Sequence, residues 1–459
     1  MRVATPKRKS KGLIDAEPVQ NSRPSSIVTL CDLRLYEKPR THATRESVMA
    51  ALREKAARIF TDARAWGRNA KVLVSTELLN VPMSWIFFYR TIFMRNLGMD
   101  EVFIGYAVML PTILQMLLPM LGGYLADRFG RKRVYLLFDV GWIISMAVWF
   151  IATEPWHVIL ALFTQGLTTT TFGIWELLLI EDTEPQHRTG IYSLVQSNYI
   201  FRGLLTPVAG TLVFLYGLDQ GCRYMFLATL ATMTVAFATR LVYLRESEIG
   251  KTLQSLDRDG PERPKGYAET SRMILKHRKL FILLVLSVLG DMTLPLITTY
   301  QPLYLSDPAA LALDESIISV IPMASSIPSL VALSLIIPRL KQNHISKALL
   351  VGYVCGIFSS VILIAAPRGS LGLAILSSVL GSARSIAVFS ILKAFLVNTI
   401  DEIDPYAKAK TMSLVTMYSA LASWPAPVIG GYLYAANPTW PFILIILLLI
   451  GSLSLMPKI

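Results

Sequence analysis

The sequence contains few of the residues that support disulfide bonds, metal binding or catalysis. Its 459 residues include three cysteines, Cys31, Cys222 and Cys355, whose spacing matches neither a CxxC motif nor a metal-ligand set. The five histidines lie at the ends of apolar segments, in loops or in the N-terminal tail, again without metal-ligand spacing. No Walker A loop is present to cradle the phosphates of ATP. We therefore expect no disulfide framework, no metal site, no cofactor and no enzymatic active site.

Charged residues are also scarce, and this scarcity excludes several classes of protein. They make up 16% of the chain, against about 25% in an average soluble domain, while hydrophobic residues make up 53%. The shortfall lies in the middle of the chain, in long apolar runs. A disordered protein, a coiled coil and an ordinary cytosolic enzyme are excluded. The pattern indicates an all-α membrane protein that crosses the bilayer many times.

The positive charge of the chain is concentrated near its start. Overall, 44 Lys and Arg against 31 Asp and Glu give a net charge of +13, which in a soluble protein would suggest nucleic-acid binding. Residues 1–71 hold 16 of these basic residues and seven of the acidic ones, and so carry +9. Because the excess belongs to a tail that precedes apolar segments, we expect a lipid bilayer as partner and no nucleic acid.

The tail has two parts. The first, with the runs KRKSKG and PVQNSRPSS, is typical of a disordered segment. Between Thr44 and Arg68, apolar residues recur at helical spacing with basic residues between them. This second part is predicted to be a helix on an anionic leaflet, a solvated helix or an extension of the first membrane span. No apolar run suited to a secretory signal occurs near the start.

Twelve apolar segments follow the tail, each long enough to cross a bilayer as a helix of about 20 residues. Their approximate ranges are 72–94, 102–125, 134–152, 157–180, 189–216, 223–243, 279–304, 315–337, 347–366, 370–396, 411–434 and 439–456. Most connections are short, and the exception is the polar segment 244–278. We therefore predict twelve transmembrane helices in two six-helix bundles, residues 72–243 and 279–459, joined by a cytoplasmic linker. We expect a monomer.

The distribution of basic loops predicts the orientation of the chain. Besides the tail, one side of the predicted membrane carries basic residues at 128–133, 188, 245–279, 339–347 and 408–410. The other side carries little beyond Arg95, Arg223 and Arg368. Basic loops remain in the cytoplasm. Both termini are therefore expected in the cytoplasm, in a multi-pass protein of the cell membrane.

An internal repeat relates the two predicted bundles. At a shift of 220 residues, segment 181–194 (EDTEPQHRTGIYSL) aligns with segment 401–414 (DEIDPYAKAKTMSL) without gaps. At the same shift, TPVAG at residues 206–210 aligns with APVIG at residues 426–430. Both matches fall in the fourth-to-fifth loop and the fifth span of each half. Two duplicated halves are typical of a transporter with a substrate site between them near the membrane midplane.

The loop after the second predicted span carries the most specific motif. It reads GYLADRFGRKR over residues 123–133 and resembles the signature loop of the major facilitator superfamily, G-x-L-x-D-R-x-G-R-[RK]-x. The acid-x-x-Pro-x-x-basic pattern at residues 182–188 resembles that family's fourth-to-fifth loop. The resemblance implies two pseudo-twofold-related six-helix bundles and a carrier that works by alternating access. It also implies that the signature loop latches the cytoplasmic side while the carrier faces outward.

The residue types of the signature loop suit such a latch. Gly123 is small enough for close helix packing, and Gly130 permits a turn with positive φ. Asp127 is expected at a neighbouring helix N-terminus or paired with Arg131, with Arg128 beside it. The alternative is that the loop is only a basic anchor that sets the topology.

Three charged residues lie near the middle of predicted spans: Arg202 in the fifth, Asp291 in the seventh and Arg384 in the tenth. A charge at the bilayer centre costs at least about 2.5–3.5 kcal/mol, so such residues normally face a cavity or a partner. We hypothesise that these three form a mid-membrane centre for substrate binding and coupling. The alternative is a structural ion pair between Asp291 and an arginine that only holds two helices together.

Further polar residues share faces of the first and fourth spans when successive residues are placed 100° apart. They are Glu77 and Asn80 in the first span, and Gln165 and Glu176 in the fourth. The family resemblance implies that spans 1, 4, 7 and 10 line a central cavity. We therefore expect these four residues to line it.

Other charges lie nearer the span ends. Asp139 is within two turns of the signature loop and is predicted to pair with the basic residues of that loop. Lys393 and Arg95 are predicted to extend toward the membrane interface.

Together these features predict a secondary active transporter of a small organic solute. Since no ATP site is present, we expect coupling to an ion gradient, in particular H⁺, with Asp291, Glu77 or Glu176 as the proton-carrying carboxylate. Export of amphipathic compounds is favoured. The alternative is uptake of an organic anion or nutrient, because Arg202 and Arg384 could receive a carboxylate. The competing class is a non-transporting membrane sensor or scaffold on the same fold, which only the basic tail supports.

Overall fold

In the computed structural model, the described part of the chain comprises residues 65–458 apart from 249, 252–266, 341–343 and 404–407. Every regular element in these residues is helical. The predicted tail helix at residues 44–68 falls almost entirely outside the described residues, and so does the centre of the predicted linker. All of the described helices belong to one compact unit within residues 59–459.

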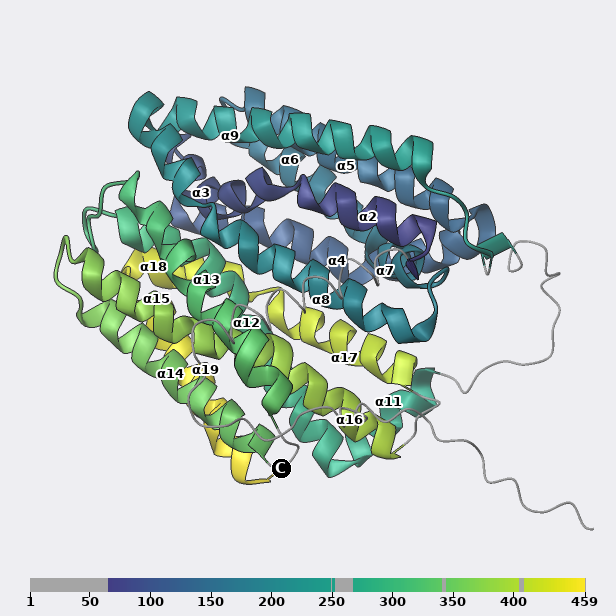
Figure 1. The fold of residues 1–459 in the computed structure, drawn as a ribbon. Coiled ribbons are helices and arrows are strands. Elements are labelled where there is room, and N and C mark those ends of the chain that lie inside the picture. Colours follow the sequence, from purple (N-terminus) through teal and green to yellow (C-terminus); the bar gives the residue numbers. More distant parts are fainter. Residues whose placement is uncertain (1–64, 249, 252–266, 341–343, 404–407, 459) are drawn as a thin grey trace, which may run out of the picture. The chain divides into compact units, whose positions relative to one another are not determined.

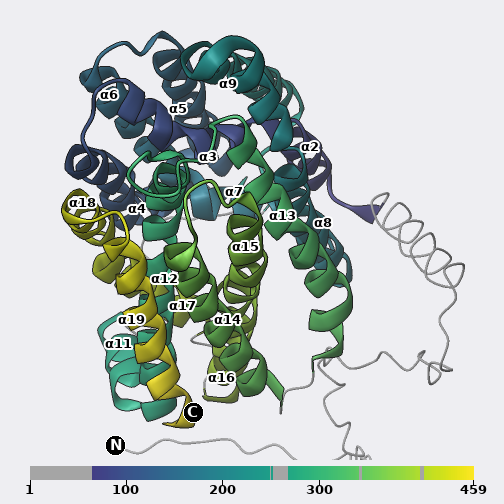
Figure 2. The same cartoon turned by 90° about the vertical axis from the view of Figure 1, so that its left-hand side faces the viewer.

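The helices of each half of the described chain lie together in both views, the first half purple to teal and the second green to yellow (Figure 1 and Figure 2). The first half comprises α2 (Arg68–Leu78), α3 (Val81–Asn96), α4 (Glu101–Phe129), α5 (Arg131–Ile151), α6 (Pro155–Leu167), η1 (Thr168–Thr171), α7 (Phe172–Ile180), α8 (Pro185–Leu204) and α9 (Pro207–Tyr243). The second half comprises α11 (Tyr267–Lys276), α12 (Arg278–Ser306), η2 (Ile317–Ser319), α13 (Val320–Val331), η3 (Ala332–Ile336), η4 (Ile337–Arg339), α14 (Ile345–Ala365), α15 (Leu371–Ile386), η6 (Ala387–Leu392), α16 (Lys393–Ile403), α17 (Lys408–Ser423), α18 (Ala426–Ala436), α19 (Trp440–Leu455) and η8 (Met456–Lys458).

The described residues contain eight helices long and apolar enough to cross a membrane, or nine if the bent pair α2 and α3 forms one span. One of the eight, the run Gly190–Tyr243, contains Gly217 with φ 75° and ψ 168°. Because this non-helical residue divides the run into two parts, the run contains both the fifth and the sixth predicted spans. The last two predicted spans correspond to the pair α17 and α18 and to the 16-residue helix α19. The predicted all-helical, multi-span fold is therefore confirmed, and each predicted span has a helical counterpart.

Capping residues explain where several helices begin and end. The side chain of Asp100 accepts a hydrogen bond from Phe103 N–H at 2.7 Å and so caps α4. Gly130 ends α4 with φ 94°, a conformation that favours glycine, and leads directly into α5. The positive φ predicted for Gly130 is thus confirmed. Pro185 and Pro207 begin α8 and α9, where a backbone N–H would have no helical partner.

Several spans depart from a regular α-helix near their middle. The first span is bent by 49° between α2 and α3, at Leu79 and Asn80. The fourth span contains the 3-10 segment η1, and the eighth and tenth contain the π-helical segments η3 and η6. Because such turns do not contain 3.6 residues, side chains before and after them do not keep the 100° spacing that the sequence-based prediction assumed.

Helices α4 and η1 approach one another closely at a glycine. A Cβ added to Gly122 would collide with the backbone carbonyl oxygen of Thr170, whereas nothing lies within 4 Å of a Cβ added to Gly123. The prediction that Gly123 provides a close helix contact is therefore wrong, and Gly122 provides it. An error of one residue is enough to miss the helix contact, because side chains at neighbouring helical positions point about 100° apart.

Hydrogen bonds link the two halves at the end of the molecule that carries the turn between α3 and α4. We call this end the opposite end, and we call the end with the turn between α4 and α5 the basic end. At the opposite end, Arg95 Nη1 donates to Asp307 Oδ2 at 2.9 Å. Tyr89 OH donates to the backbone carbonyl oxygen of Glu315 at 2.7 Å. The halves are therefore held together at this end.

Candidate functional site

A cavity of about 570 Å³ lies among the helices of the first half. Its volume is in the range of about 300–1,000 Å³ that is usual for sites that bind small molecules. The lining comes from the first, third, fourth, fifth and sixth spans. Four of the predicted site residues contribute to it: Glu77, Asn80, Glu176 and Arg202. We call it the first-half cavity.

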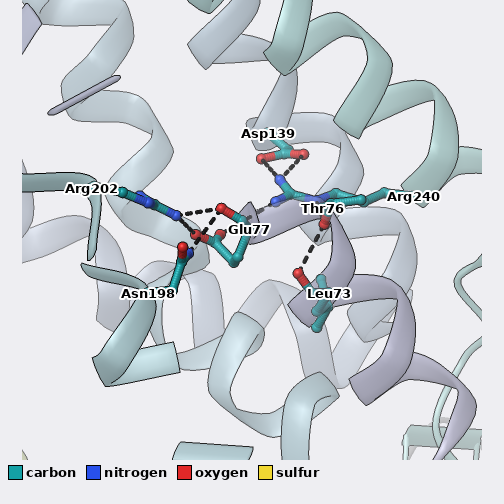
Figure 3. A network of polar contacts seen from close by, with 7 residues as sticks. All are labelled: Leu73, Thr76, Glu77, Asp139, Asn198, Arg202 and Arg240. Atoms are coloured by element: carbon teal, nitrogen blue, oxygen red, sulfur yellow. Dashed lines mark hydrogen bonds and ion pairs between the residues drawn. The ribbon is translucent and has the colours of Figure 1, made fainter. Parts of the chain in front are cut away.

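Glu77 lies at the centre of a buried polar network in this cavity (Figure 3). Its Oε2 is 2.7 Å from Arg202 Nη2, and its Oε1 is 3.3 Å from Arg240 Nη2. Arg202 also donates to the backbone carbonyl oxygen of Glu77 at 2.6 Å, and Asn198 Nδ2 donates to the same oxygen at 3.0 Å. That carbonyl is available because α2 ends at Leu78, so the break in the first span helps to create the site.

Asp139 and Arg240 form the second ion pair of the network. Arg240 Nη1 is 3.0 Å from Asp139 Oδ2, and the side chains are only 4% and 6% exposed. Arg240 Nε also donates to Thr76 Oγ1 at 2.9 Å. The prediction that Asp139 pairs with basic residues of the signature loop is therefore wrong. Sequence reasoning missed Arg240, but an acid within an apolar span requires a partner, and that signal could have found it.

The first-half cavity has an excess of acidic groups. It holds three carboxylates and two guanidinium groups, those of Glu77, Asp139, Glu176, Arg202 and Arg240. Among the described residues, Glu176 has no ion-pair partner, and its side chain is exposed to the cavity. Six aromatic side chains also contribute to the lining. Carboxylates and the faces of aromatic rings both attract cations, so the cavity suits an apolar solute with a positive charge.

The three mid-membrane charges predicted to form one centre are not in contact with one another. Arg202 pairs with a carboxylate of the first half. Arg384, in the second half, donates from Nη1 to Thr293 Oγ1 at 2.8 Å. In the described structure, Asp291 forms an ion pair with neither arginine. The first half therefore supplies one charged site, and the second half supplies separate charged groups.

Lys393 connects two of the predicted site residues electrostatically. Its ammonium group is within electrostatic range of the carboxylates of Asp291 in the second half and Glu176 in the first. It lies 5.7 Å from the centroid of the Phe389 ring. The π-helical segment η6 separates Lys393 from Arg384, so a regular spacing of 100° per residue does not relate the directions of these two side chains.

Gln165 does not line the first-half cavity, although Glu176 does. The two residues were predicted to share one face of the fourth span. The 3-10 segment η1 lies between them and changes the direction of the side chains that follow it. The structure thus places Gln165 apart from the other predicted lining residues.

The signature loop is held by acidic residues from outside the motif. The guanidinium group of Arg131 forms an ion pair with the Glu181 carboxylate at the end of the fourth span. The Glu246 carboxylate accepts hydrogen bonds from the backbone N–H groups of Arg131 at 2.9 Å and Lys132 at 3.0 Å, and so caps α5. Asp127 is exposed and, among the described ion pairs, does not pair with Arg131. Asp127 was expected at a neighbouring helix N-terminus or paired with Arg131. Arg131 pairs with Glu181 instead, and Glu246 caps the N-terminus of α5.

Asp307, at the opposite end, accepts hydrogen bonds from both halves. Arg95 donates from α3, Tyr434 OH from α18 at 2.9 Å, and Ala309 N–H at 2.8 Å. Burial by itself would raise the pKa of the Asp307 carboxyl, but these hydrogen bonds outweigh it and hold the pKa below its ordinary value. Arg95 also lies 3.2 Å from Glu101. Arg95, which was predicted to extend to the membrane interface, lies in the last turn of α3 and is ion-paired there.

Comparison with known families decides the class of the chain. The family model described as Major Facilitator Superfamily matches residues 74–424. The chain belongs to this superfamily. It is therefore a multi-pass membrane protein from a superfamily of secondary transporters and not of enzymes.

Two named relatives align with this transporter over part of their length. The "Na(+), Li(+), K(+)/H(+) antiporter" of Planococcus maritimus is 23% identical over 254 residues, which cover 53% of this chain and 58% of the relative. "Multidrug resistance protein MdtH" of Yersinia enterocolitica serotype O:8 / biotype 1B is 30% identical over 131 residues, which cover 28% of this chain and 33% of the relative. The chain thus spans 58% and 33% of the lengths of these two relatives.

Solved structures resemble this transporter over almost their whole length. The nucleoside transporter NupG superposes with a TM-score of 0.63 at 14% identity, over 85% of this chain and 98% of that one. A bacterial homologue of the human lysosomal transporter Spinster, in an inward-facing and unoccupied conformation, gives a TM-score of 0.64 at 13% identity, over 84% and 95% of the two chains. These likenesses confirm the predicted major facilitator fold.

Proposed function

We propose that this transporter exports small amphipathic organic solutes in exchange for protons, by alternating access. The observation that carries the proposal is the composition of the first-half cavity. It contains one carboxylate more than it contains guanidinium groups, and six aromatic side chains surround these charges. A carboxylate without an ion-pair partner can bind a proton or a cationic solute, and competition between the two couples their movements.

Glu176 is the carboxylate best suited to this competition. Within the described structure it has no ion-pair partner, and Phe172 and Trp175 contribute to the lining beside it. An aromatic surface next to a carboxylate favours a solute that is both apolar and positively charged. Asn80 adds a polar group to the same lining and is proposed to help orient the solute.

Glu77 is proposed to couple protonation to the movement of helices. Its carboxylate contacts Arg202 from α8 and Arg240 from α9, so one side chain joins three spans. A proton on Glu77 would remove the negative charge that holds both guanidinium groups. The contacts between these spans would weaken, and the helices could then change position.

Asp291 is proposed as a further proton-binding carboxylate, in the second half. The Lys393 ammonium is within electrostatic range of both Asp291 and Glu176. Lys393 and Asp291 belong to the second half and Glu176 to the first, so movement of the halves changes the distance from Lys393 to Glu176 but leaves Asp291 beside Lys393. A proton on Asp291 would leave the Lys393 charge free to attract Glu176, and would therefore alter the balance between the two conformations.

The contacts between the halves support an inward-facing state. With the basic end in the cytoplasm, as the positive-inside rule predicts, the links at the opposite end close the outer side. Both termini then lie in the cytoplasm and the protein lies in the cell membrane. To face outward, the transporter must break the Arg95–Asp307 contact and bring the halves together at the basic end. The exposed Asp127 and Arg128 of the signature loop are proposed to make contacts there.

The names of the two relatives, an antiporter and a multidrug resistance protein, agree with this proposal. A direct test uses the full chain in proteoliposomes that enclose a pH-sensitive dye. Lipophilic cations such as ethidium and tetraphenylphosphonium are added under an imposed proton gradient. We expect solute-dependent proton movement that is at least tenfold slower in Glu176→Gln.

The matched control is Glu402→Gln, which changes a surface carboxylate that is 59% exposed. This variant should transport like the unmodified protein. Transport that continues unchanged after the proton gradient is collapsed would contradict proton coupling. Equal activity of Glu176→Gln and Glu402→Gln would contradict the proposed role of the first-half cavity.

Uptake of an organic anion is the second candidate function. It is favoured by Arg384, whose guanidinium group contacts hydroxyl groups and, in the described structure, no carboxylate. Concentrative uptake of a labelled small carboxylate, reduced by the substitution Arg384→Gln, would support this candidate over export.

A further inference from the structure

Arg384 differs from the other arginines of the described structure that are 5% exposed or less. Arg384 is 4% exposed. The other three each form an ion pair with a carboxylate: Arg131 with Glu181, Arg202 with Glu77, and Arg240 with both Glu77 and Asp139.

The contacts of Arg384 are with neutral groups. Nη1 donates to Thr293 Oγ1 at 2.8 Å, and Nη2 donates to Ser385 Oγ at 3.3 Å. No acidic side chain of the described residues forms an ion pair with it. A buried charge without a counter-charge is strongly unfavourable, and natural proteins normally pair it. The guanidinium group therefore lacks an anion.

A second cavity, of about 280 Å³, lies beside Arg384 among the helices of the second half. Seven serines and Gln301 contribute to its lining. The serines come from three helices: α13, α14 and α15. None of the lining residues is shared with the first-half cavity. We call it the serine cavity, and it places neutral hydrogen-bonding groups around one positive charge.

The serine hydroxyls can adapt to a ligand. In the described structure they donate to backbone carbonyl oxygens, as Ser325 does to Pro322 at 2.9 Å and Ser382 does to Val379 at 2.6 Å. A hydroxyl rotates easily about its C–O bond and both donates and accepts. Rotation would let these groups donate to an anion held by Arg384.

The path of the Arg384 side chain is built into the fold. The Arg384 side chain passes directly over Gly356 of α14, where an added Cβ would lie 2.8 Å from Arg384 Cδ. Any larger residue at position 356 would displace the arginine. The guanidinium group is thus directed to the serine cavity by a glycine on the neighbouring helix, as expected for a constructed binding site.

We propose that Arg384 and the serine cavity bind a small organic acid through its carboxylate. A guanidinium group binds a carboxylate with two parallel hydrogen bonds, which a single halide ion cannot accept in the same way. Since liquid water occupies about 30 Å³ per molecule, the 280 Å³ cavity has room for a short carbon chain as well as the carboxylate. Binding at this site depends neither on proton coupling nor on the direction of transport.

The test measures thermal unfolding of the purified full chain in detergent. Acetate, lactate and succinate are compared with chloride as sodium salts at equal ionic strength. A ligand that binds the folded protein raises the melting temperature. We expect at least one carboxylate to raise it by several degrees above chloride, with half-saturation in the millimolar range.

Two variants and one control locate the effect. Arg384→Gln and Gly356→Ala should each weaken the carboxylate effect at least tenfold, the first by removing the charge and the second by displacing it. Arg368→Gln removes a charge at an exposed position and should leave the effect intact. Gly356→Ala keeps every charge, so it tests the site even if Arg384→Gln does not fold.

An equal shift in Arg384→Gln would overturn the proposal, because the effect would then come from another site. A shift produced equally by chloride, or by none of the carboxylates, would overturn it as well. Failure here leaves proton-coupled export untouched, since that function is measured with cationic solutes and Glu176→Gln. Carboxylate binding without any transport activity would instead contradict the proposed function alone.

Discussion

Arg95 Nη1 lies 2.9 Å from Asp307 Oδ2, and this contact joins the end of the first span to the end of the seventh across the two halves of the transporter. The Asp307 side chain is 4% exposed and that of Arg95 is 35% exposed. Tyr434 donates to the same carboxylate oxygen at 2.9 Å. Because the contact spans both halves, it stabilises one conformation of the transport cycle and must be broken in the other.

The substitution Asp307→Asn should therefore favour opening of the opposite end. Since Arg95 is about one third exposed, we expect a loss of about 1 kcal/mol, or about a fivefold change in the conformational equilibrium. Pulsed electron paramagnetic resonance between spin labels in the α3–α4 and α18–α19 turns would measure the distance across this end. Asp314→Asn, at an exposed acid in a neighbouring loop, is the matched control and should leave the distances unchanged.

The same contact predicts how the conformation depends on pH. Asp307 has a pKa below its ordinary value of 3.8, so its contribution is fully present above the ordinary pKa and is lost as the pH falls through the lower, folded value. The spin-label distances should stay constant from about pH 8 to about pH 5 and should lengthen only below about pH 4. Opening of this end between pH 7 and pH 5 would contradict the assignment to Asp307.

The two carboxylates of the buried network should differ in their importance for stability. In the described structure, Glu77 is the one carboxylate paired with Arg202, whereas Arg240 contacts both Glu77 and Asp139. Glu77→Gln leaves Arg202 without a counter-charge and should cost about 3 kcal/mol or more. Asp139→Asn should cost less, because Arg240 would still form its ion pair with Glu77. Thermal unfolding of the purified variants measures the order, and the reverse order would contradict the network.

A double-mutant cycle of Asp139→Asn with Arg240→Gln gives a second measure of this network. The two residues are in contact, so we expect a coupling energy of about 1–3 kcal/mol. A coupling energy near zero would indicate that the ion pair does not form in the membrane protein in solution.

Adjacent glycines in the second span should respond in opposite ways to alanine. Gly122→Ala would place a Cβ against the Thr170 carbonyl oxygen and should destabilise the protein by about 1–3 kcal/mol. Gly123→Ala has free space and should be neutral or stabilising by about 0.5–1 kcal/mol, because alanine favours a helix interior. Melting temperatures of the two variants provide the comparison, and each variant serves as the control for the other.

The helix breaks explain why the predicted site was found only in part. Glu77 and Asn80 flank the end of α2, and they line the first-half cavity with Arg202 and Glu176. Gln165 does not, because η1 changes the direction of the fourth span. A prediction that treats each span as one regular helix correctly places residues on a shared face when they lie on the same side of such a break. It fails for residues on opposite sides of the break.

The sequence by itself determined that the chain crosses a membrane many times, where its apolar segments lie and that Gly130 permits a positive φ. These properties depend on the apolar length of each segment and on the backbone of single residues, so they can be predicted locally. Only the tertiary structure decided the partners of the charges, as for Asp139 with Arg240 and Arg95 with Asp307. An ion pair depends on which helices become neighbours and how each one bends. The local sequence around a residue in one span indicates neither.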